Sequence, residues 1–363
     1  MINPNTEFWR ERRVLVTGHT GFKGAWMCAW LEEMGADVSG FALAPETGAN
    51  LFHDLSPWRK VTSIIGDIRD REAIKAACIA ADPEVVIHMA AQSLVRRSHR
   101  DPHGTLATNV QGTGNLLEML DVCANLQAVL VVTSDKCYRN DNSGRPFIEG
   151  DPLGGNDPYS ASKAAQETIA IGWRRGLLEN RETAPRLATA RAGNVIGGGD
   201  WSEDRILPDL FRAIEQGEAL EVRNPGATRP WQHVLDVLAG YLNYAEALVR
   251  DTDRAMPKAL NFGPRTTEAK PVQWLVERAL ARVRAAGLDA KDWQGVPSSG
   301  PQEAAALSLD ADLAATTLDW RPRLSQEDAI DWTADWHAAA MGGKPPRDLV
   351  GEQISRFTEL TSV

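Results

Sequence analysis

The sequence predicts an α/β fold: a doubly wound parallel sheet with helices on both faces, followed by a smaller C-terminal lobe. Two observations lead to this prediction. Short apolar runs alternate with longer segments of helical spacing through the first half of the chain, and the second half is richer in proline, glycine and tryptophan. Such alternation is typical of βαβ units, whose strands lie parallel. We expect one domain over residues 1–192 and the lobe over 193–363, with the segment near 231–263 folding back onto the first domain.

The predicted elements follow from the spacing of apolar residues along the chain. Runs rich in valine, isoleucine and leucine predict strands, and apolar residues three or four apart predict helices. Strands are expected over 13–17, 37–43, 63–65, 84–88, 128–133 and 187–192. Helices are expected over 22–34, 105–123, 158–175, 272–284 and 325–340. Because no repeat, low-complexity tract or flexible linker separates the two parts, we expect them to share an interface.

Composition and charge argue against several classes of function. The 363 residues carry 49 acidic and 39 basic side chains, a formal net charge of −10, so a nucleic-acid backbone would be repelled. No apolar run approaches the roughly 20 residues that span a bilayer, and the N-terminus has no signal-peptide core. The cysteines and histidines show no metal-ligand spacing. We therefore expect a cytoplasmic protein with reduced thiols and with no metal, membrane or nucleic-acid partner.

A glycine-rich turn follows the first predicted strand and precedes a helix. Glycines at this spacing allow a tight turn, let the backbone approach a pyrophosphate and let helix and strand pack closely. The anion then lies on free N–H groups at the helix N-terminus. An ordinary glycine-rich turn is the alternative, but its place after the first strand of an α/β pattern favours a Rossmann-type dinucleotide site. The candidate cofactor residues in the turn are Gly18, His19, Thr20, Gly21, Phe22, Lys23 and Gly24.

The second predicted strand lacks the residue that usually selects the dinucleotide. An acidic residue at the end of that strand is typical of NAD sites, and a basic residue nearby is typical of NADP sites. Residues 38–43 read VSGFAL, so this strand does not decide between the two. Asp67 and Ile68, after the third strand, are candidates to hold the adenine edge. The alternative is that Asp67 caps a helix over residues 69–78.

Tyr159 and Lys163 are four residues apart, on one face of a predicted helix. A nearby cation favours phenolate, so we expect Lys163 to lower the pKa of Tyr159 from its usual value of about 10. The tyrosine would then act as a base near neutral pH. The spacing alone is common by chance, but a strand ending at Thr133 and Ser134 and the glycine turn upstream favour an active site.

Several segments together resemble the extended short-chain dehydrogenase/reductases, the NAD-dependent epimerase/dehydratase family. The resemblance rests on the glycine turn, on residues 90–92 (AAQ) and 109–113 (NVQGT), and on Tyr159 with Lys163. Four longer segments are similar to family members that dehydrate CDP-glucose: TGHTGFKG at 17–24, SDKCY at 134–138, RAGNVIGGGDW at 191–201 and TRPWQHV at 228–234. The resemblance covers most of the chain and implies NAD as the cofactor of the first domain. It adds to the candidate cofactor residues Ala90, Ala91, Gln92, Asn109 and Thr133, besides Tyr159 and Lys163.

The resemblance implies 4,6-dehydration of a nucleotide sugar, most closely CDP-D-glucose to CDP-4-dehydro-6-deoxy-D-glucose. Tyr159 would take the C4 hydroxyl proton as hydride passes to NAD. A base would then remove the C5 proton, an acid would protonate the leaving C6 hydroxyl, and the hydride would return to C6. By resemblance Asp135 is the acid and Lys136 the base. The predicted catalytic residues are Ser134, Asp135, Lys136, Tyr159 and Lys163.

Lys136 can act as a base only if its surroundings lower the pKa of its ammonium group. A base must be neutral, whereas the usual pKa of lysine is about 10.4. We expect burial, Lys163 and the positive nicotinamide ring to lower the pKa of Lys136. An ion pair within a loop, or a helix cap, is the alternative explanation of Asp135 and Lys136.

The same resemblance places the nucleotide sugar on the C-terminal lobe. Asn194 and Arg229 fall where related enzymes hold the diphosphate and the sugar, and arginine can donate two parallel hydrogen bonds to phosphate. Arg205 and Arg223 are weaker candidates, because either is also explained as a solvated surface charge. Family members often dimerise through the helices equivalent to 105–123 and 158–175. We therefore expect a homodimer or a higher homo-oligomer.

Other functions stay open on the sequence alone. One is dehydration of another sugar nucleotide, such as UDP-N-acetylglucosamine or dTDP-glucose, since the choice of CDP depends on resemblance only. Another is 4-epimerisation, which requires no acid–base pair at Asp135 and Lys136. The third is a non-catalytic NAD-binding sensor on the same fold, against which the presence of both Tyr159 and Lys163 argues.

Overall fold

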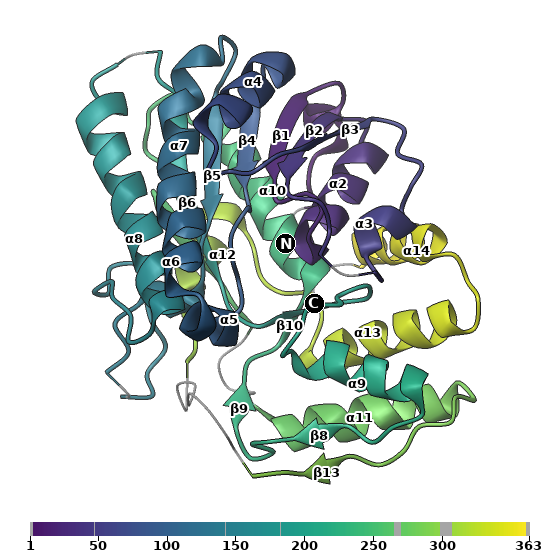
Figure 1. Ribbon diagram of the computed structural model, residues 1–363. Helices are drawn as coiled ribbons and strands as arrows, with labels where there is room; N and C mark the ends of the chain where they lie inside the picture. The colour runs from purple at the N-terminus through teal and green to yellow at the C-terminus, as the bar shows by residue number, and fades with distance from the viewer. Residues whose placement is uncertain are drawn as a thin grey trace.

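The computed structural model describes residues 3–46, 48–141, 143–181, 183–264, 270–297 and 307–360. Within these ranges seven parallel strands form one sheet in the order β11-β6-β5-β4-β1-β2-β3, with helices on both faces (Figure 1), which confirms the predicted α/β fold. The order of the strands reverses between β1 and β4, at the centre of the sheet. In open α/β sheets ligands bind at the carboxyl edge beside such a reversal.

The central strands are buried along their whole length. β4 and β5 expose no residue, as is typical of parallel strands that are covered on both faces. The strands of the sheet are β1 (Arg13–Thr17), β2 (Asp37–Ala42), β3 (Val61–Ile65), β4 (Val85–His88), β5 (Ala128–Val132), β6 (Arg186–Ala192) and β11 (Ala259–Phe262). The predicted strands therefore form at the expected places, with shifts of one or two residues at their ends.

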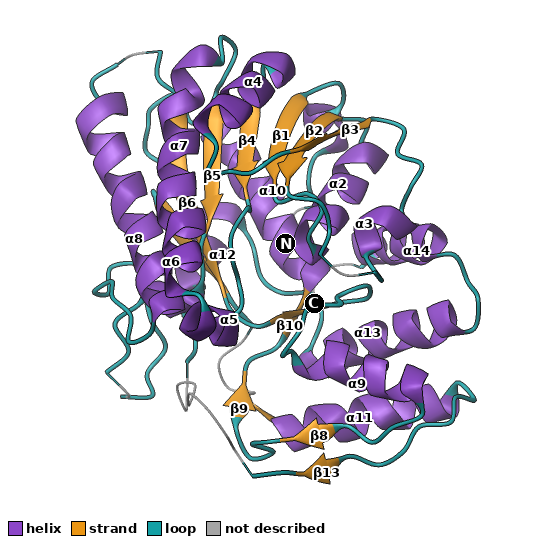
Figure 2. Ribbon diagram, in the orientation of Figure 1, coloured by secondary structure: helices purple, strands orange, loops and turns teal. Residues whose placement is uncertain are grey.

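Two apolar cores lie on opposite faces of the sheet, because successive side chains of a strand point to opposite sides. Leu15 packs in the core under α4, α7 and α8, whereas Val14 and Val16 pack in the core under α2 and α10 (Figure 2). The helices of the sheet domain are α1 (Thr6–Trp9), α2 (Phe22–Glu33), α3 (Leu51–Asp54), α4 (Arg71–Ala81), α5 (Val95–Arg100), α6 (Pro102–Leu106), α7 (Gly112–Glu118), α8 (Pro158–Trp173), α10 (Val234–Arg250), α12 (Asp312–Leu318) and α14 (Pro346–Glu359).

The helix predicted over 105–123 is not regular. A wide π turn, Ala107–Gln111, separates α6 from α7, and a 3-10 turn, Met119–Val122, ends the segment. Asn109 lies in the wide turn and is fully buried. π turns are frequent at functional sites, and this one places the Asn109 amide beside the loop that leaves β4.

A separate core holds the smaller lobe together, below the carboxyl edge of the sheet in Figure 1. It is built from α9 (Ile206–Gln216), α11 (Val272–Ala285) and α13 (Gln326–Met341). Short strand pairs border these helices: β7 (Val195–Ile196) with β10 (Gln232–His233), β8 (Glu221–Val222) with β13 (Gln294–Gly295), and β9 (Thr228–Arg229) with β12 (Lys270–Pro271). None of the helices in the described ranges has the length and apolar character needed to cross a bilayer.

The chain returns from the smaller lobe to the sheet. α10 packs on β5 and β6, and β11 pairs in parallel with β6, with Leu260 opposite Ala190. This return places the β6–β7 connection, residues 193–194, directly beside the sheet edge that carries the site described below.

Asp236 couples α10 to the segment between α12 and α13. Its carboxylate accepts hydrogen bonds from the backbone N–H groups of Arg323 (2.6 Å) and Leu324 (3.3 Å). Burial raises the pKa of Asp236 from 3.8 to about 7. Between these values the folded protein keeps a proton that the unfolded chain loses, so this group stabilises at low pH and its contribution is lost as the pH rises to 7.

We expect the free energy of unfolding of wild type, relative to Asp236→Asn, to fall by about 1 kcal/mol per pH unit between pH 4 and 7. The asparagine keeps an acceptor oxygen but does not titrate. Urea unfolding of both proteins across this range measures the difference, with Asp335→Asn, at a half-buried aspartate paired with Arg282, as a control. A constant difference would contradict the prediction.

Candidate active site

The glycine turn connects β1 to α2 and contacts the end of β4. Gly18 has a φ of +77°, and a Cβ there would lie 2.8 Å from the backbone N of Ala90. A Cβ on Gly24 would lie 2.1 Å from the carbonyl oxygen of Gly18, so the helix packs directly on the turn. Gly21 is the N-cap of α2 and has no side chain to cap the first N–H groups. This cradle of backbone N–H groups fits a pyrophosphate.

The side chains of the turn have different roles from its backbone. His19 is fully buried beside Gly40 of β2 and shares a 2.7 Å hydrogen bond with Ser63 of β3. Burial lowers the pKa of His19 to about 4, so the ring is neutral. Thr20 donates to the carbonyl of Leu43 (2.9 Å). Both side chains therefore brace β2, and only their backbone remains to face a cofactor.

Lys23 of α2 is half-buried, and its side chain lies near residues of the predicted catalytic site. Its ammonium lies over the ring of Tyr241, 5.9 Å from the centroid. Burial, and then the charge of Arg205, lower the pKa of Lys23 to about 8, while the charges of Asp135 and Asp200 oppose this shift. The Lys23 side chain is therefore close enough to the predicted acid for the two charges to interact.

The positions after β3 are only partly as predicted. Asp67 binds Arg69, with 2.5 Å between Oδ2 and Nη2, and the residue that caps α4 is Asp70. The interpretation of Asp67 as a helix cap is therefore wrong. The side chain of Ile68 is buried against Gly112 and belongs to the core, so only the backbone of Ile68 is left to face an adenine edge.

Two apolar side chains that the sequence analysis missed lie at this corner. Leu43 follows β2 and Ile65 ends β3, and they are 48% and 57% exposed. Exposed aliphatic side chains at the carboxyl ends of neighbouring strands offer an apolar surface to a flat ring. The sequence contained a signal for both residues, since each is an aliphatic residue at the carboxyl end of a predicted strand.

Asn109 and Gln92 fix the loop that leaves β4. The Asn109 side chain accepts from the backbone N–H of Gln92 (2.7 Å) and donates to its carbonyl (2.9 Å) and to Ser162 (2.8 Å). Thr17 accepts from the N–H of Ala90 (3.1 Å). Ala90, Ala91 and Gln92 therefore lie in one loop beside the glycine turn. The Asn109 side chain supports this loop through its hydrogen bonds with the backbone of Gln92.

Tyr159 and Lys163 begin α8, whose N-terminus is capped by Asp157. Both side chains are buried. Burial, with a further effect from the charge of Lys23, lowers the pKa of Lys163 to about 7. Burial raises the pKa of Tyr159 to about 12, although a hydrogen bond with Ser134 opposes the shift. The predicted direction for the pKa of Tyr159 is therefore wrong for the protein alone, because loss of water around the phenol outweighs the hydrogen bond with Ser134 and the charge of Arg205.

The predicted acid and base lie directly after β5. Ser134 caps a 3-10 turn, Asp135–Cys137, by accepting from the backbone N–H of Lys136 (3.2 Å), and its hydroxyl donates to Asp135 (2.9 Å). Asp135 is buried against Gly193, where a Cβ would lie 3.0 Å from Oδ2. Burial raises the pKa of Asp135, against the opposing charge of Lys136. Lys136 itself is half-buried.

Thr133, predicted as a cofactor residue, uses its side chain elsewhere. Its hydroxyl donates to Glu167 of α8 (2.5 Å) and is buried. The Thr133 side chain therefore points away from the turn and into the body of the domain. Ser134, one residue later, faces Tyr159 instead.

The four predicted substrate residues come to the site from the smaller lobe, with different degrees of contact. Arg229 lies close enough to Asp135 for its charge to lower the pKa of that carboxyl. Arg205 binds the buried Asp200 (3.2 Å) and its charge opposes the raised pKa of Tyr159, so it reaches into the site. Asn194 is half-buried in the β6–β7 connection. Arg223 is exposed.

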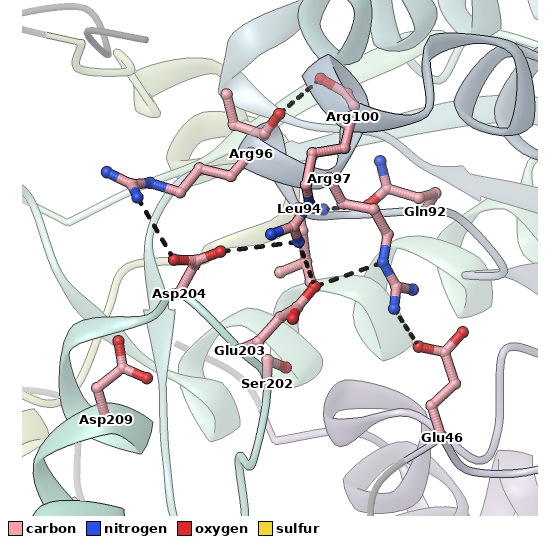
Figure 3. Close-up of polar contacts among 12 residues, drawn as sticks. Glu46, Gln92, Leu94, Arg96, Arg97, Arg100, Ser202, Glu203, Asp204 and Asp209 are labelled. Carbon is pink, nitrogen blue, oxygen red and sulfur yellow. Dashed lines mark hydrogen bonds and ion pairs between the residues drawn. The ribbon is translucent and has the colours of Figure 1, made fainter. Parts of the chain in front are cut away.

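Asp204 joins the smaller lobe to the helix after the Gln92 loop. It lies 3.6 Å from Arg96 of α5 and 4.0 Å from Arg100 (Figure 3). Asp204 also lies 3.6 Å from Arg223. Its φ of +58° turns the chain just before Arg205. Asp204 therefore ties the segment that carries Arg205 to the edge of the sheet domain.

A second set of ion pairs extends this contact. Glu203 binds Arg100 (2.9 Å) and Arg97 (3.4 Å), and Arg97 also binds Glu46 (2.6 Å), beyond the end of β2 (Figure 3). Three segments that are distant in sequence thus meet in this set of ion pairs.

Comparison with known proteins defines the family. The chain matches the sequence model described as the NAD dependent epimerase/dehydratase family over residues 14–263. The chain belongs to this family. It is also 41% identical to a CDP-glucose 4,6-dehydratase of Salmonella typhimurium, over 100% of both chains. A probable dTDP-glucose 4,6-dehydratase of Sinorhizobium fredii is 28% identical, over 94% of this chain and 98% of the relative.

Solved structures share the fold of this family member. The dTDP-glucose 4,6-dehydratase DesIV of Streptomyces venezuelae, solved with NAD and TYD bound, has a TM-score of 0.76 at 24% identity, covering 92% of this chain and 99% of its own. A UDP-glucose-4-epimerase of Stenotrophomonas maltophila, solved with NAD bound, has a TM-score of 0.77 at 21% identity, with coverages of 92% and 99%. At these identities the likeness concerns the fold alone, and it agrees with the predicted Rossmann-type sheet.

Proposed function

We propose that the chain is an NAD-dependent 4,6-dehydratase that converts CDP-D-glucose to CDP-4-dehydro-6-deoxy-D-glucose and water. The observation that carries the proposal is the placement of Asp135 and Lys136 directly beside Ser134 and Tyr159, at the carboxyl edge of the sheet. A 4-epimerase would have no use for such an acid–base pair. Full-length identity of 41% to a relative named as a CDP-glucose 4,6-dehydratase supports the choice of substrate.

The sheet domain, residues 1–192, is proposed to bind NAD. The backbone of the turn from Gly18 to Gly24 would hold the pyrophosphate, and the loop over 90–92 would border the nicotinamide half. Leu43 and Ile65 would border the adenine. The bound cofactor supplies the hydride acceptor for C4 and the hydride donor for C6.

Each catalytic side chain is proposed to move one proton. Tyr159, hydrogen-bonded to Ser134, takes the proton of the C4 hydroxyl as C4 is oxidised. Lys136 takes the C5 proton, which the new C4 ketone acidifies. Asp135 supplies the proton that converts the leaving C6 hydroxyl to water, and its raised pKa suits a carboxyl group that must hold this proton. The C5 position regains a proton when C6 is reduced.

The smaller lobe, built around α9, α11 and α13, is proposed to bind the nucleotide sugar. Arg229 and Arg205 approach Asp135 and Tyr159, so their guanidinium groups would hold the diphosphate next to the reacting sugar. Asn194, one residue from Gly193, would contact the glycosyl region. Arg223, which is exposed and lies 3.6 Å from Asp204, would contact the part of the nucleotide sugar that is farthest from the reacting carbons.

Incubation with CDP-, dTDP- and UDP-sugars tests the proposal, because 4-keto products absorb after alkali treatment. We expect the largest kcat/KM with CDP-glucose. A preference for dTDP-glucose or UDP-N-acetylglucosamine would overturn the choice of nucleotide. C4 epimers without a keto product would identify an epimerase, and NAD binding without any turnover would identify a sensor.

Asp204→Asn should raise KM for CDP-glucose by about 3- to 10-fold while kcat changes less than about 2-fold. Partly exposed ion pairs contribute roughly 0.2–1 kcal/mol each, and asparagine keeps the backbone preference for positive φ. Looser attachment of the Arg205 segment weakens binding without altering the proton transfers. Steady-state kinetics measures the effect, and Asp335→Asn, which breaks the distant pair with Arg282, is the matched control. An unchanged KM would contradict this role for Asp204.

We also propose that two copies associate through α7 and α8, which would form a four-helix interface. Leu106, Val122 and Leu177 leave exposed apolar surface in the helical turns that flank these two helices. Sedimentation of the purified protein tests this, and a monomer would exclude it.

A further inference from the structure

A buried ion pair lies beneath the catalytic segment. Glu167 of α8 and Arg191 of β6 expose only 1% and 3% of their side chains, and two bonds join them: Nη2 to Oε2 (2.7 Å) and Nε to Oε1 (2.9 Å). Breaking such a pair is strongly destabilising, yet well-packed apolar residues are often at least as stable. Stability alone therefore does not explain why a charged pair occupies this position.

Two further hydrogen bonds of the pair hold the two ends of one short segment. Thr133 donates to Glu167 (2.5 Å), and Arg191 donates to the hydroxyl of Tyr138 (2.7 Å). Tyr138 in turn donates to Asn261 of β11 (2.7 Å). Between Thr133 and Tyr138 lie Ser134, Asp135 and Lys136, so the pair fixes the start and the end of the acid–base segment.

The same pair also contacts the elements that carry the rest of the site. Glu167 is four residues after Lys163 and eight after Tyr159, on the same helix. Arg191 is two residues before Gly193, against which Asp135 packs. The pair therefore lies where the Tyr159–Lys163 helix, the acid–base segment and the β6–β7 connection meet.

We propose that Glu167 and Arg191 are positioning residues that set the acid–base segment against the Tyr159–Lys163 helix. This inference rests on the proposed dehydratase function. Oxidation at C4 depends on α8, whereas elimination across C5 and C6 depends on the segment held by Thr133 and Tyr138. Loosening that segment should therefore slow elimination more than oxidation, and an oxidised sugar with reduced cofactor should accumulate.

Two variants loosen the segment from different points. Arg191→Lys keeps the charge opposite Glu167, but one ammonium group cannot also reach Tyr138 and the carbonyl of Glu149, which Arg191 contacts at 3.1 Å. Tyr138→Phe removes one hydroxyl and leaves the ion pair intact, so it remains informative if the lysine variant does not fold. Glu179→Gln, which breaks the ion pair with Arg174 at the far end of the helix, is the control.

Single-turnover reaction of each holoenzyme with CDP-glucose measures cofactor reduction by its absorbance and elimination by the 4-keto-6-deoxy product. In both variants we expect elimination to fall about 10- to 100-fold, since small misplacements of reacting groups cost up to this much. Cofactor reduction should stay within about 3-fold, and Glu179→Gln should behave as wild type.

Loss of folded protein alone would lower both rates by one factor, so an unchanged ratio of the two rates in both variants would overturn the positioning role. Wild type that reduces no cofactor and forms no keto sugar would instead overturn the proposed function, and this inference with it. Wild type that turns over, beside variants with unchanged ratios, would overturn this inference alone.

Discussion

Lys136→Met is expected to lower kcat for dehydration of CDP-glucose by roughly 10²- to 10⁴-fold, the usual contribution of a general base. Methionine keeps the length of the side chain but cannot accept a proton. Lys136 is half-buried and directly follows the buried Asp135 in the chain. Steady-state kinetics measures the loss, and exchange of the C5 proton with solvent deuterium should be lost with it.

Binding of NAD to this variant should be unchanged, because the glycine turn is formed by a different part of the chain. Lys344→Met, which removes an exposed lysine paired with Glu352, is the matched control for loss of a lysine charge. Normal turnover or normal C5 exchange in Lys136→Met would exclude Lys136 as the base. Lys23 would then be the next candidate, since it lies close to Asp135 and burial lowers its pKa to about 8.

Features encoded by local patterns could be predicted from the sequence. Continuous apolar runs specify β4 and β5, and the glycine spacing specifies a turn on which α2 packs closely. The helix α9 was missed although its apolar residues Leu207, Leu210 and Ile214 recur at helical spacing.

The directions of side chains could not be predicted, because they depend on contacts between distant segments. Ile68 follows a strand and reads as a site residue, yet its side chain fills the space beside Gly112. Thr133 directly follows β5, and its hydroxyl donates a hydrogen bond to Glu167, 34 residues later in the chain. No spacing in the sequence indicates either contact.

Electrostatics was the least predictable part of the site. The spacing of Tyr159 and Lys163 correctly indicates a shared helix, but it contains no information on how much water the fold removes. Burial raises the pKa of Tyr159 to about 12 and lowers the pKa of Lys163 to about 7. Arg205 shows the opposite case, since a residue equally well explained as a surface charge lies close enough to Tyr159 for its charge to lower the pKa of that side chain.

Close packing at the glycine turn predicts a large effect of Gly24→Ala on NAD binding. In Gly24→Ala the new Cβ would lie 2.1 Å from the Gly18 carbonyl oxygen and 2.7 Å from the Cα of His19. Both are backbone atoms, so the turn must move away from the helix. We expect the free energy of unfolding to fall by about 1–3 kcal/mol, as for other overpacked sites, and NAD affinity to fall at least about 10-fold. Urea unfolding and calorimetric titration with NAD measure the two effects.

Gly172→Ala provides the matched control, because Gly172 also lies in a helix and a Cβ there meets no atom within 4 Å among the described residues. That variant should gain roughly 0.5–1 kcal/mol, since alanine restricts the unfolded chain and favours helix. The two substitutions add the same methyl group, so a difference between them isolates the contact with the turn. Normal NAD affinity in a folded Gly24→Ala protein would show that the pyrophosphate does not depend on this turn, and the proposed cofactor site would have to lie elsewhere along the sheet edge.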